Sequence, residues 1–144
     1  MALATSLVGG RTWIDQTEVS RESAATAVWV DTYVPHDAVL LVHDAGVISE
    51  LAHRRAVDLV GLKSPASVGA HLRSTWPSCG ADRSIAVAAI ARAAGASYVV
   101  VDASWDRAFG LVQGLSAQGF RLTLERPSPV SNGYVVYRLW QRPG

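Results

Sequence analysis

AVLLVHDAGVISELAHRRAVDLVGLKSP, residues 38–65, contains two short apolar runs that decide the fold. The first, Ala38–His43, is a continuous apolar run between turn residues, which favours a strand buried on both faces. The second, Ala56–Val60, ends at Gly61. Because buried parallel strands are covered by helices, the stretch predicts an α/β fold, with a brief helix over Ala45–His53 between the two strands.

The composition limits the classes of protein to which this chain can belong. It has 144 residues, 49% of them apolar, which is the size of one domain with a hydrophobic core. The formal charge of +1 comes from 13 basic and 12 acidic residues in both halves, which argues against a nucleic-acid partner. The one cysteine, Cys79, excludes an internal disulfide. No apolar run reaches the ~18 to 20 residues that a membrane-spanning helix requires.

Turn residues and apolar periodicity divide the rest of the chain into further elements. They predict helices over Thr12–Val34, from Ser64 or Ser67 to Ser74, from Asp82 to Gly95 and from Ser104 to Gly119, and strands over Ser97–Asp102, Phe120–Arg126 and Tyr134–Trp140. The connection between the last two strands has no room for a helix, so these strands should pair antiparallel at one end of the sheet.

The sequence therefore predicts a three-layer α/β sandwich, with a mostly parallel five-stranded sheet and an antiparallel C-terminal strand pair. We expect a single domain over residues 12–144. Residues 1–11 are expected to be disordered or a remnant of an upstream or vector segment.

Polar residues gather where the predicted strands end. His43 and Asp44 follow the first strand, and Asp102 ends the third. Because ligands bind outside the carboxyl ends of parallel strands, we expect these residues to face one crevice. His43 and Asp44 are candidates for an acid–base pair, although neighbours at a strand end usually point in different directions. A metal site built from these three residues and His36 has suitable ligand types but no recognised spacing, so we predict no metal and no other cofactor.

Asp58 is a different case, because it lies within the second predicted strand. An unpaired carboxylate buried there would be strongly destabilising. It therefore needs a partner, for which Arg54, Arg55 and a backbone amide after the first strand are the candidates. We favour a structural role for Asp58 over catalysis or ligand binding, and we predict no catalytic residue in this chain.

Two tryptophans complete the candidate site. Trp76 lies in a Thr-Trp-Pro-Ser-Cys-Gly loop, and Trp105 follows soon after Asp102. Such rings can stack on a sugar face, but a tryptophan after a strand more often plugs the end of a sheet. The predicted ligand-binding residues are therefore His43, Asp44, Trp76, Asp102 and Trp105.

The stretch from Val42 to Pro65 resembles a signature in the soluble C-terminal portion of bacterial polytopic membrane glycosyltransferases of the family 39-like, GT-C type. There it reads approximately H-D-x-G-A-x-x-Y-F-S-x-R-x-V-x-D-L-x-G-L-x-S/N-P. The matching residues are His43, Asp44, Gly46, Arg54, Val57, Asp58, Leu59, Gly61, Leu62 and Pro65. A helix ending in Trp29 to Pro35 and the strand after Ser97 also fit, so the likeness covers most of the chain. The aromatic position of the signature is Glu50 here, so no role of that ring is carried over.

The resemblance implies that Gly46, Arg54, Asp58, Gly61 and Pro65 form a structural motif. It also implies an extracytoplasmic location and attachment to a membrane-embedded helical bundle. In such enzymes the bundle transfers a sugar from a polyprenyl-phosphate carrier, and the catalytic carboxylate lies in an early extracytoplasmic loop that these residues do not contain. We therefore expect a noncatalytic accessory domain that docks on the bundle or helps to hold the acceptor glycan.

Two other functions remain open on the sequence. A small stand-alone enzyme, or a nucleotide- or sugar-binding protein, would use His43, Asp44 and Asp102 at the carboxyl edge. Side chains within about 4 to 6 Å of one another in an open pocket would favour that function. An oligomerising module would instead use the exposed face of the first helix or the edge of the last strand.

Overall fold

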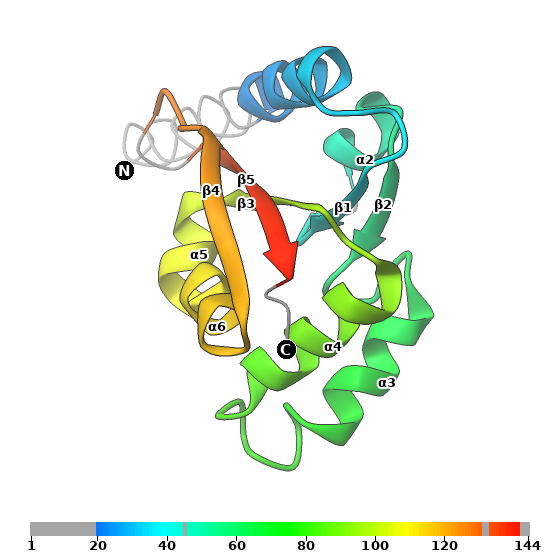
Figure 1. The fold of residues 1–144 in the computed structure, drawn as a ribbon, viewed down its shortest axis with the longest axis vertical. Helices are drawn as coiled ribbons and strands as arrows, with labels where there is room; N and C mark the ends of the chain where they lie inside the picture. Colours follow the sequence, from blue (N-terminus) through cyan, green and yellow to red (C-terminus); the bar gives the residue numbers. More distant parts are fainter. Residues whose placement is uncertain (1–19, 45, 131–132, 142–144) are drawn as a thin grey trace, which may run out of the picture.

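The computed structural model describes residues 20–44, 46–130 and 133–141, and the predicted N-terminal segment 1–11 lies outside these ranges. The described part of the first helix covers residues 20–33. It is followed by β1 (Val39–Val42), α2 (Val47–Leu51), β2 (Arg55–Asp58), α3 (Pro65–Arg73), α4 (Arg83–Ala94), β3 (Tyr98–Asp102), α5 (Ala103–Phe109), α6 (Leu111–Ala117), β4 (Phe120–Arg126) and β5 (Tyr134–Gln141). The chain has an α/β fold with one five-stranded sheet (Figure 1). In the described ranges, no helix combines the length and the apolar character needed to cross a lipid bilayer.

The sheet has the strand order β2-β1-β3-β5-β4. β1 pairs in parallel with β2 and β3, whereas β5 pairs antiparallel with β3 and β4. The predicted antiparallel pair at the C-terminal end is confirmed, and the sheet as a whole is mixed. The expectation that the last strand offers a free edge is wrong, because β5 lies inside the sheet and β4 forms the edge.

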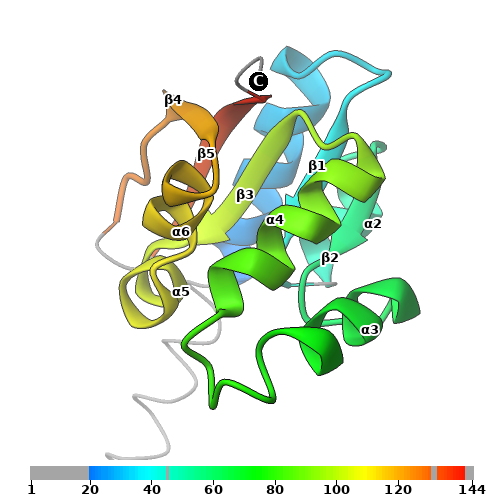
Figure 2. The same cartoon turned by 60° about the horizontal axis from the view of Figure 1, so that its bottom comes forward.

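Alternate side chains of the central strands enter two apolar clusters. On β1, Leu40 and Val42 belong to the cluster that includes Val30 of the first helix. Leu41, between them, belongs to the cluster that includes Val87 of α4. Figure 2 shows α4 in front of the sheet and the first helix behind it. Because both faces of β1 are covered, the strand reads in the sequence as a continuous apolar run.

The long helix predicted from Ser104 to Gly119 is in fact two short helices. The cap of α5 is not Ser104 but Asp102, whose side chain accepts hydrogen bonds from the amides of Ser104 and Trp105. α5 ends at Gly110, which has a φ of 59° in the left-handed region, and α6 begins at the next residue. Glycine adopts this conformation without the steric cost of a Cβ atom, which explains the break.

The ends of the other elements also differ from the prediction. β2 ends at Asp58, so Leu59 and Val60 lie beyond the strand. Asp58 is thus the last residue of its strand and not an interior one, and its carboxylate can reach the following loop. Asp82 occupies the N-cap position of α4 as predicted, but its side chain makes no capping hydrogen bond.

Candidate functional site

Asp58 braces the loop between β2 and α3. It is 2% exposed, and its carboxylate accepts hydrogen bonds from the amides of Val60 (2.8 Å) and Lys63 (2.9 Å). Its own amide donates to the Ser64 hydroxyl at 3.0 Å. Two backbone donors therefore satisfy the buried carboxylate. They follow the second strand and not the first, so the expected amide after the first strand is not the partner. Within the described ranges, no arginine forms an ion pair with it.

Gly61 and Pro65 shape the same loop. Gly61 has a φ of 105°, and a Cβ atom there would lie 2.6 Å from Cγ2 of Val68. Pro65 is the first residue of α3, where a missing amide hydrogen leaves no helical hydrogen bond unmade. The Ser67 hydroxyl donates to the carbonyl of Asp58 at 2.7 Å. These contacts hold the start of α3 against the end of β2.

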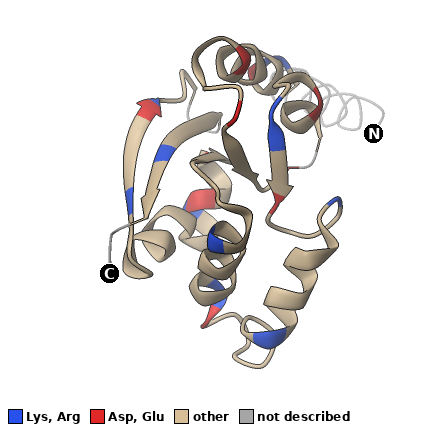
Figure 3. Cartoon of the chain, turned by 45° about the vertical axis from the view of Figure 1, so that its right-hand side comes forward, with Lys and Arg blue, Asp and Glu red and all other residues tan. Residues whose placement is uncertain are grey.

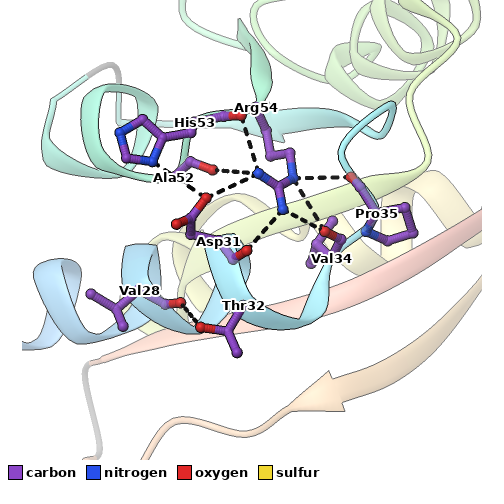
Figure 4. A network of polar contacts seen from close by, with 8 residues as sticks. All are labelled: Val28, Asp31, Thr32, Val34, Pro35, Ala52, His53 and Arg54. Carbon is purple, nitrogen blue, oxygen red and sulfur yellow. Dashed lines mark hydrogen bonds and ion pairs between the residues drawn. The ribbon is translucent and has the colours of Figure 1, made fainter.

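Arg54 joins the start of β2 to the end of the first helix (Figure 4). Its side chain is 1% exposed, and its guanidinium donates to the Asp31 carboxylate at 3.1 Å. It also donates to the carbonyl oxygens of Val34 (2.7 Å), Pro35 (3.0 Å), Asp31, Ala52 and His53. The last carbonyls of a helix lack intrahelical partners, so a cation that binds them stabilises the helix end. Because these groups occupy the guanidinium, Arg54 is a structural residue.

Asp31 contacts both Arg54 and His53. Its Oδ1 atom lies 3.3 Å from Nδ1 of His53 and 3.1 Å from Nη1 of Arg54. Burial acts to raise the pKa of Asp31, but the hydrogen bonds and charges of His53 and Arg54 outweigh it and hold the pKa below its usual range. The network therefore contains an ionised carboxylate at neutral pH.

His43 and Asp44 make different kinds of contact, although both meet Tyr134. Asp44 accepts hydrogen bonds from the Tyr134 hydroxyl (2.7 Å) and the Gly46 amide (2.8 Å). The His43 ring packs against Trp105 and Tyr134, with centroid distances of 4.8 Å and 5.7 Å. The two residues therefore do not form the acid–base pair that their adjacency suggests.

The environment of His43 keeps its imidazole neutral. The residue is 8% exposed, and Nδ1 has no hydrogen-bond partner among the described residues. Burial lowers the pKa of His43, and this effect exceeds the opposing influence of the Asp44 and Asp102 carboxylates. Burial and the hydrogen bond to Asp44 raise the pKa of Tyr134, so its hydroxyl keeps its proton and acts as a donor.

Asp102 is also engaged by its own neighbourhood. Its Oδ1 atom accepts hydrogen bonds from the Ser104 amide (2.7 Å), the Trp105 amide (3.2 Å) and the Ser104 hydroxyl. These contacts fix the start of α5 and thereby the position of Trp105 beside His43. Asp102 therefore positions Trp105 through its contacts with the first turn of α5.

A cavity of about 420 Å³ lies at the carboxyl ends of β1, β2 and β3. Three aromatic side chains line it, namely Trp76, Trp105 and Phe109. The aliphatic lining consists of Leu59, Val60, Val68, Val87 and Leu111, and the polar lining of His43, His71 and Arg83. A mostly apolar pocket with a few polar groups at the carboxyl edge of a sheet is the usual form of a small-molecule site.

His71 is a structural part of this lining. Its Nε2 atom lies 2.7 Å from the Leu59 carbonyl, which can only accept, so Nε2 carries the proton. Its Nδ1 atom then accepts from the Thr75 hydroxyl at 2.8 Å. Both ring nitrogens are therefore occupied, and the ring holds α3 against the loop after β2.

The cavity contains part of the predicted ligand-binding set. His43, Trp76 and Trp105 line it, whereas Asp44 and Asp102 do not. Sequence reasoning missed Arg83 and Phe109, which lie on α4 and α5 and reach the cavity only through the packing of those helices. Phe109 stands four residues after Trp105 on one helix, and this spacing is the one pattern that could have indicated it.

No metal site accompanies the cavity in the part of the chain that the structure describes. Residues 20–44, 46–130 and 133–141 contain no group of three or more His, Cys, Asp or Glu side chains that could hold a metal ion. The four-residue site considered from His36, His43, Asp44 and Asp102 is therefore not assembled.

A family model, described as a domain of unknown function (DUF8728), matches residues 11–139. That range contains β1, β2, the braced loop between β2 and α3, and every residue that lines the cavity. No curated protein matches the chain. Because the match covers nearly the whole sequence, the chain belongs to the DUF8728 family.

Proposed function

We propose that this chain is a noncatalytic binding domain, the extracytoplasmic accessory part of a membrane glycosyltransferase that transfers sugar from a polyprenyl-phosphate carrier. The binding site is the cavity at the carboxyl edge of the sheet. The partners are a membrane-embedded helical bundle of the parent protein and a segment of acceptor glycan at the exposed Trp76.

One observation carries the binding role. The carboxylates at the carboxyl edge are all engaged by the protein itself, since Asp44, Asp58 and Asp102 accept hydrogen bonds from nearby amides or hydroxyls. Proton transfer to or from a substrate needs a group that can reach it. Three aromatic rings surround an open cavity at the same edge. An edge whose carboxylates are engaged in this way, beside an apolar and aromatic cavity, supports a role in binding.

Exposed apolar side chains on α3 and in the chain segments before and after it support docking on another apolar surface. Leu62 is 82% exposed and Trp76 is 71% exposed, and Leu72 on α3 is also exposed. Large exposed apolar side chains are candidates for an interaction site. Lys, Arg, Asp and Glu are distributed over several elements (Figure 3), which supports the absence of a nucleic-acid partner.

We also propose that the fold is a three-layer sandwich with a mostly parallel sheet. Helices that contribute to apolar clusters on both faces of the sheet support a three-layer sandwich. The parallel pairing of β1 with both neighbours, and the antiparallel pairing of β5 with both of its neighbours, place four strands in one direction and support a mostly parallel sheet.

One feature favours a second candidate, a small stand-alone enzyme or nucleotide- or sugar-binding protein. His43 lines the cavity as a neutral imidazole and could exchange a proton with a substrate. Its nearest carboxylate neighbour in sequence, Asp44, is bound to Tyr134 and does not orient the ring. A His43→Gln variant that abolished a turnover detected with the purified protein would support this candidate over the first.

The attachment to a membrane bundle is tested on the gene. We expect the reading frame upstream of residue 1 to encode several membrane-spanning segments and an early loop with a carboxylate. A complete gene without adjoining membrane-spanning segments would contradict the proposed glycosyltransferase context.

The glycan contact is tested by titrating the protein with cell-wall oligosaccharides. We expect changes in tryptophan fluorescence and in the NMR shifts of the residues around Trp76, and we expect Trp76→Ala to abolish them. Trp140→Ala is the matched control, because Trp140 lies on β5 and outside the cavity. Fluorescence and chemical shifts that stay constant through the titration would remove the glycan from the proposal.

A further inference from the structure

We propose that the cavity binds one molecule of a single-chain amphiphilic carboxylate, with its apolar chain inside and its carboxylate at Arg83. This inference rests on the proposed function only in using the same cavity as a binding site. It names the chemical class of the molecule inside the cavity, whereas the proposed glycan contact concerns the exposed Trp76.

The walls of the cavity suit an apolar chain. Leu59, Val87 and Leu111 are buried side chains whose surfaces face the cavity. The rings of Trp105 and Phe109 pack against each other in a tilted arrangement, with centroids 4.7 Å apart. The volume of about 420 Å³ falls in the range of small-molecule sites. An apolar chain that enters such a space gains the free energy of leaving water without losing hydrogen bonds.

The polar lining offers one group for a charged ligand. Both ring nitrogens of His71 have partners in the protein, and His43 is a neutral ring wedged between Trp105 and Tyr134. Arg83 remains, half-buried at the start of α4. Its guanidinium lies over the Phe109 ring, 4.7 Å from the centroid, and forms no ion pair with another residue of the described ranges.

Charge complementarity then selects an anion. Among the residues that the structure describes, no aspartate or glutamate lines the cavity, and the Arg83 guanidinium is the one permanent charge in its lining. A guanidinium in a partly desolvated position binds a carboxylate by short, charge-assisted hydrogen bonds. The cation–π contact with Phe109 helps to hold the guanidinium at the cavity.

The same lining disfavours a sugar or a nucleotide inside the cavity. Such a ligand would bring several hydroxyls or ring nitrogens among side chains that cannot pair with them, at a cost of roughly 1–3 kcal/mol for each unpaired group. One anionic end and one apolar body match the cavity better. A glycan stacked on the outer face of Trp76 avoids this cost because its hydroxyls stay in water.

Isothermal titration calorimetry with decanoate, kept below its critical micelle concentration, tests the proposal on the full chain. We expect saturable binding of one decanoate per protein, with quenching of tryptophan fluorescence. Decanol, which has the same chain without the charge, is expected to bind ~10-fold or more weakly, the loss of one charge-assisted hydrogen-bonded contact. Equal affinities for the acid and the alcohol would overturn the assignment of Arg83.

Three variants locate the site. Arg83→Gln should weaken decanoate ~10-fold or more and leave decanol unchanged, whereas Arg73→Gln, an exposed arginine on α3 outside this cavity, should alter neither. Val68→Trp, a substitution at an exposed cavity position, should weaken both ligands, with circular dichroism confirming that the variant is folded.

The remaining outcomes are distinguishable from a failure of the proposed function. Response to anionic vesicles or micelles with no binding of monomeric decanoate would replace the cavity site with a membrane surface and overturn the proposal. The decanoate and vesicle experiments do not depend on the gene upstream of residue 1. Only the upstream reading frame tests the glycosyltransferase context.

Discussion

At Asp58, two backbone amides offset the cost of burying a charge, and no lysine or arginine of the described ranges forms an ion pair with it. The amides belong to Val60 and Lys63, on either side of Gly61, so the carboxylate sets the course of the chain from β2 into α3. The loop also supplies Leu59 and Val60 to the cavity wall. The Asp58 carboxylate thus links the stability of the loop between β2 and α3 to the shape of the cavity.

Replacing Asp58 by Ala should lower the free energy of unfolding by about 2–4 kcal/mol, because two loop amides lose a charged acceptor and become unpaired on burial. Urea denaturation followed by circular dichroism measures this change. Asp37→Ala, at an exposed position, is the control and should leave the transition midpoint unchanged. A midpoint for Asp58→Ala equal to that of the wild type would show that Asp58 is not a brace.

His43 should make stability depend on pH. Its pKa is lowered in the folded state, so the unfolded chain binds the proton more tightly. The stability contributed by the neutral ring is fully present above the unfolded value of about 6.5 and is lost as the pH falls through the range between that value and the folded pKa.

His43→Phe keeps a ring against Trp105 and Tyr134 and should flatten this pH dependence. Urea midpoints measured at intervals from neutral pH down to about pH 5 test the change. His36→Gln, at an exposed position, should retain the wild-type slope. An identical slope in the His43→Phe protein would mean that other groups cause the loss of stability in acid.

At the residue scale, the sequence predicts that a buried charged side chain needs a hydrogen-bond partner, but it does not predict which group that partner is. The need of a buried Asp58 for a donor follows from the sequence, but whether the donor is an arginine or an amide depends on a loop conformation set by Gly61. Arg83 could not be predicted as part of a site, because a lone arginine after a loop is usually solvated. It lines the cavity because its guanidinium extends from the first turn of α4 over the Phe109 ring of α5.

At the element scale, local patterns of apolar residues predict most of the helices and strands. The apolar runs of β1 and β3 and the alternation in β4 are visible in the sequence, since the burial of whole faces produces them. The break between α5 and α6 is not visible, because apolar residues keep helical spacing across Gly110. Asp102 was placed correctly at a strand end, but its role as the cap of α5 depends on a turn that the pattern does not show.

Gly110→Ala should lower the free energy of unfolding by about 1–2 kcal/mol, because an L-residue with a Cβ is strained at a φ of 59°. No neighbouring atom lies within 4 Å of the added Cβ, so the loss reports the backbone alone. Gly110→Asn should lower the free energy of unfolding by less than Gly110→Ala does, since asparagine tolerates the left-handed region. Thermal denaturation of both variants checks the order, and a Gly110→Ala protein as stable as the wild type would show that the break is not a conformational requirement.

At the scale of the whole molecule, one ion pair connects segments far apart in the chain. Nη1 of Arg126 on β4 lies 3.0 Å from Oε1 of Glu22 and also donates to the Thr26 hydroxyl and the Tyr134 carbonyl. Both charged side chains are mostly buried. This contact fastens the first helix to the C-terminal strand pair, as the Arg54 network fastens it to β2.

Arg126→Met should destabilise the protein by about 3 kcal/mol, because Glu22 would keep a buried charge without a partner. The double variant Arg126→Met/Glu22→Leu should recover much of the loss, since neither charge then remains. Arg121→Met, at an exposed position of the same strand, is the control. Chemical denaturation gives the coupling energy, and purely additive losses in the double variant would contradict a linked pair.

The position of β5 has a consequence for the order of events on the ribosome. β5 is the last described strand in the chain, yet it lies between β3 and β4 in the sheet. While the nascent chain is still being synthesised, β4 has no hydrogen-bonding neighbour, and the edge of β3 stays open until the residues from Tyr134 to Gln141 have left the exit tunnel. The sheet is therefore completed in one late step, and a translation arrest before residue 134 would leave two unpaired strand edges accessible to chaperones and proteases.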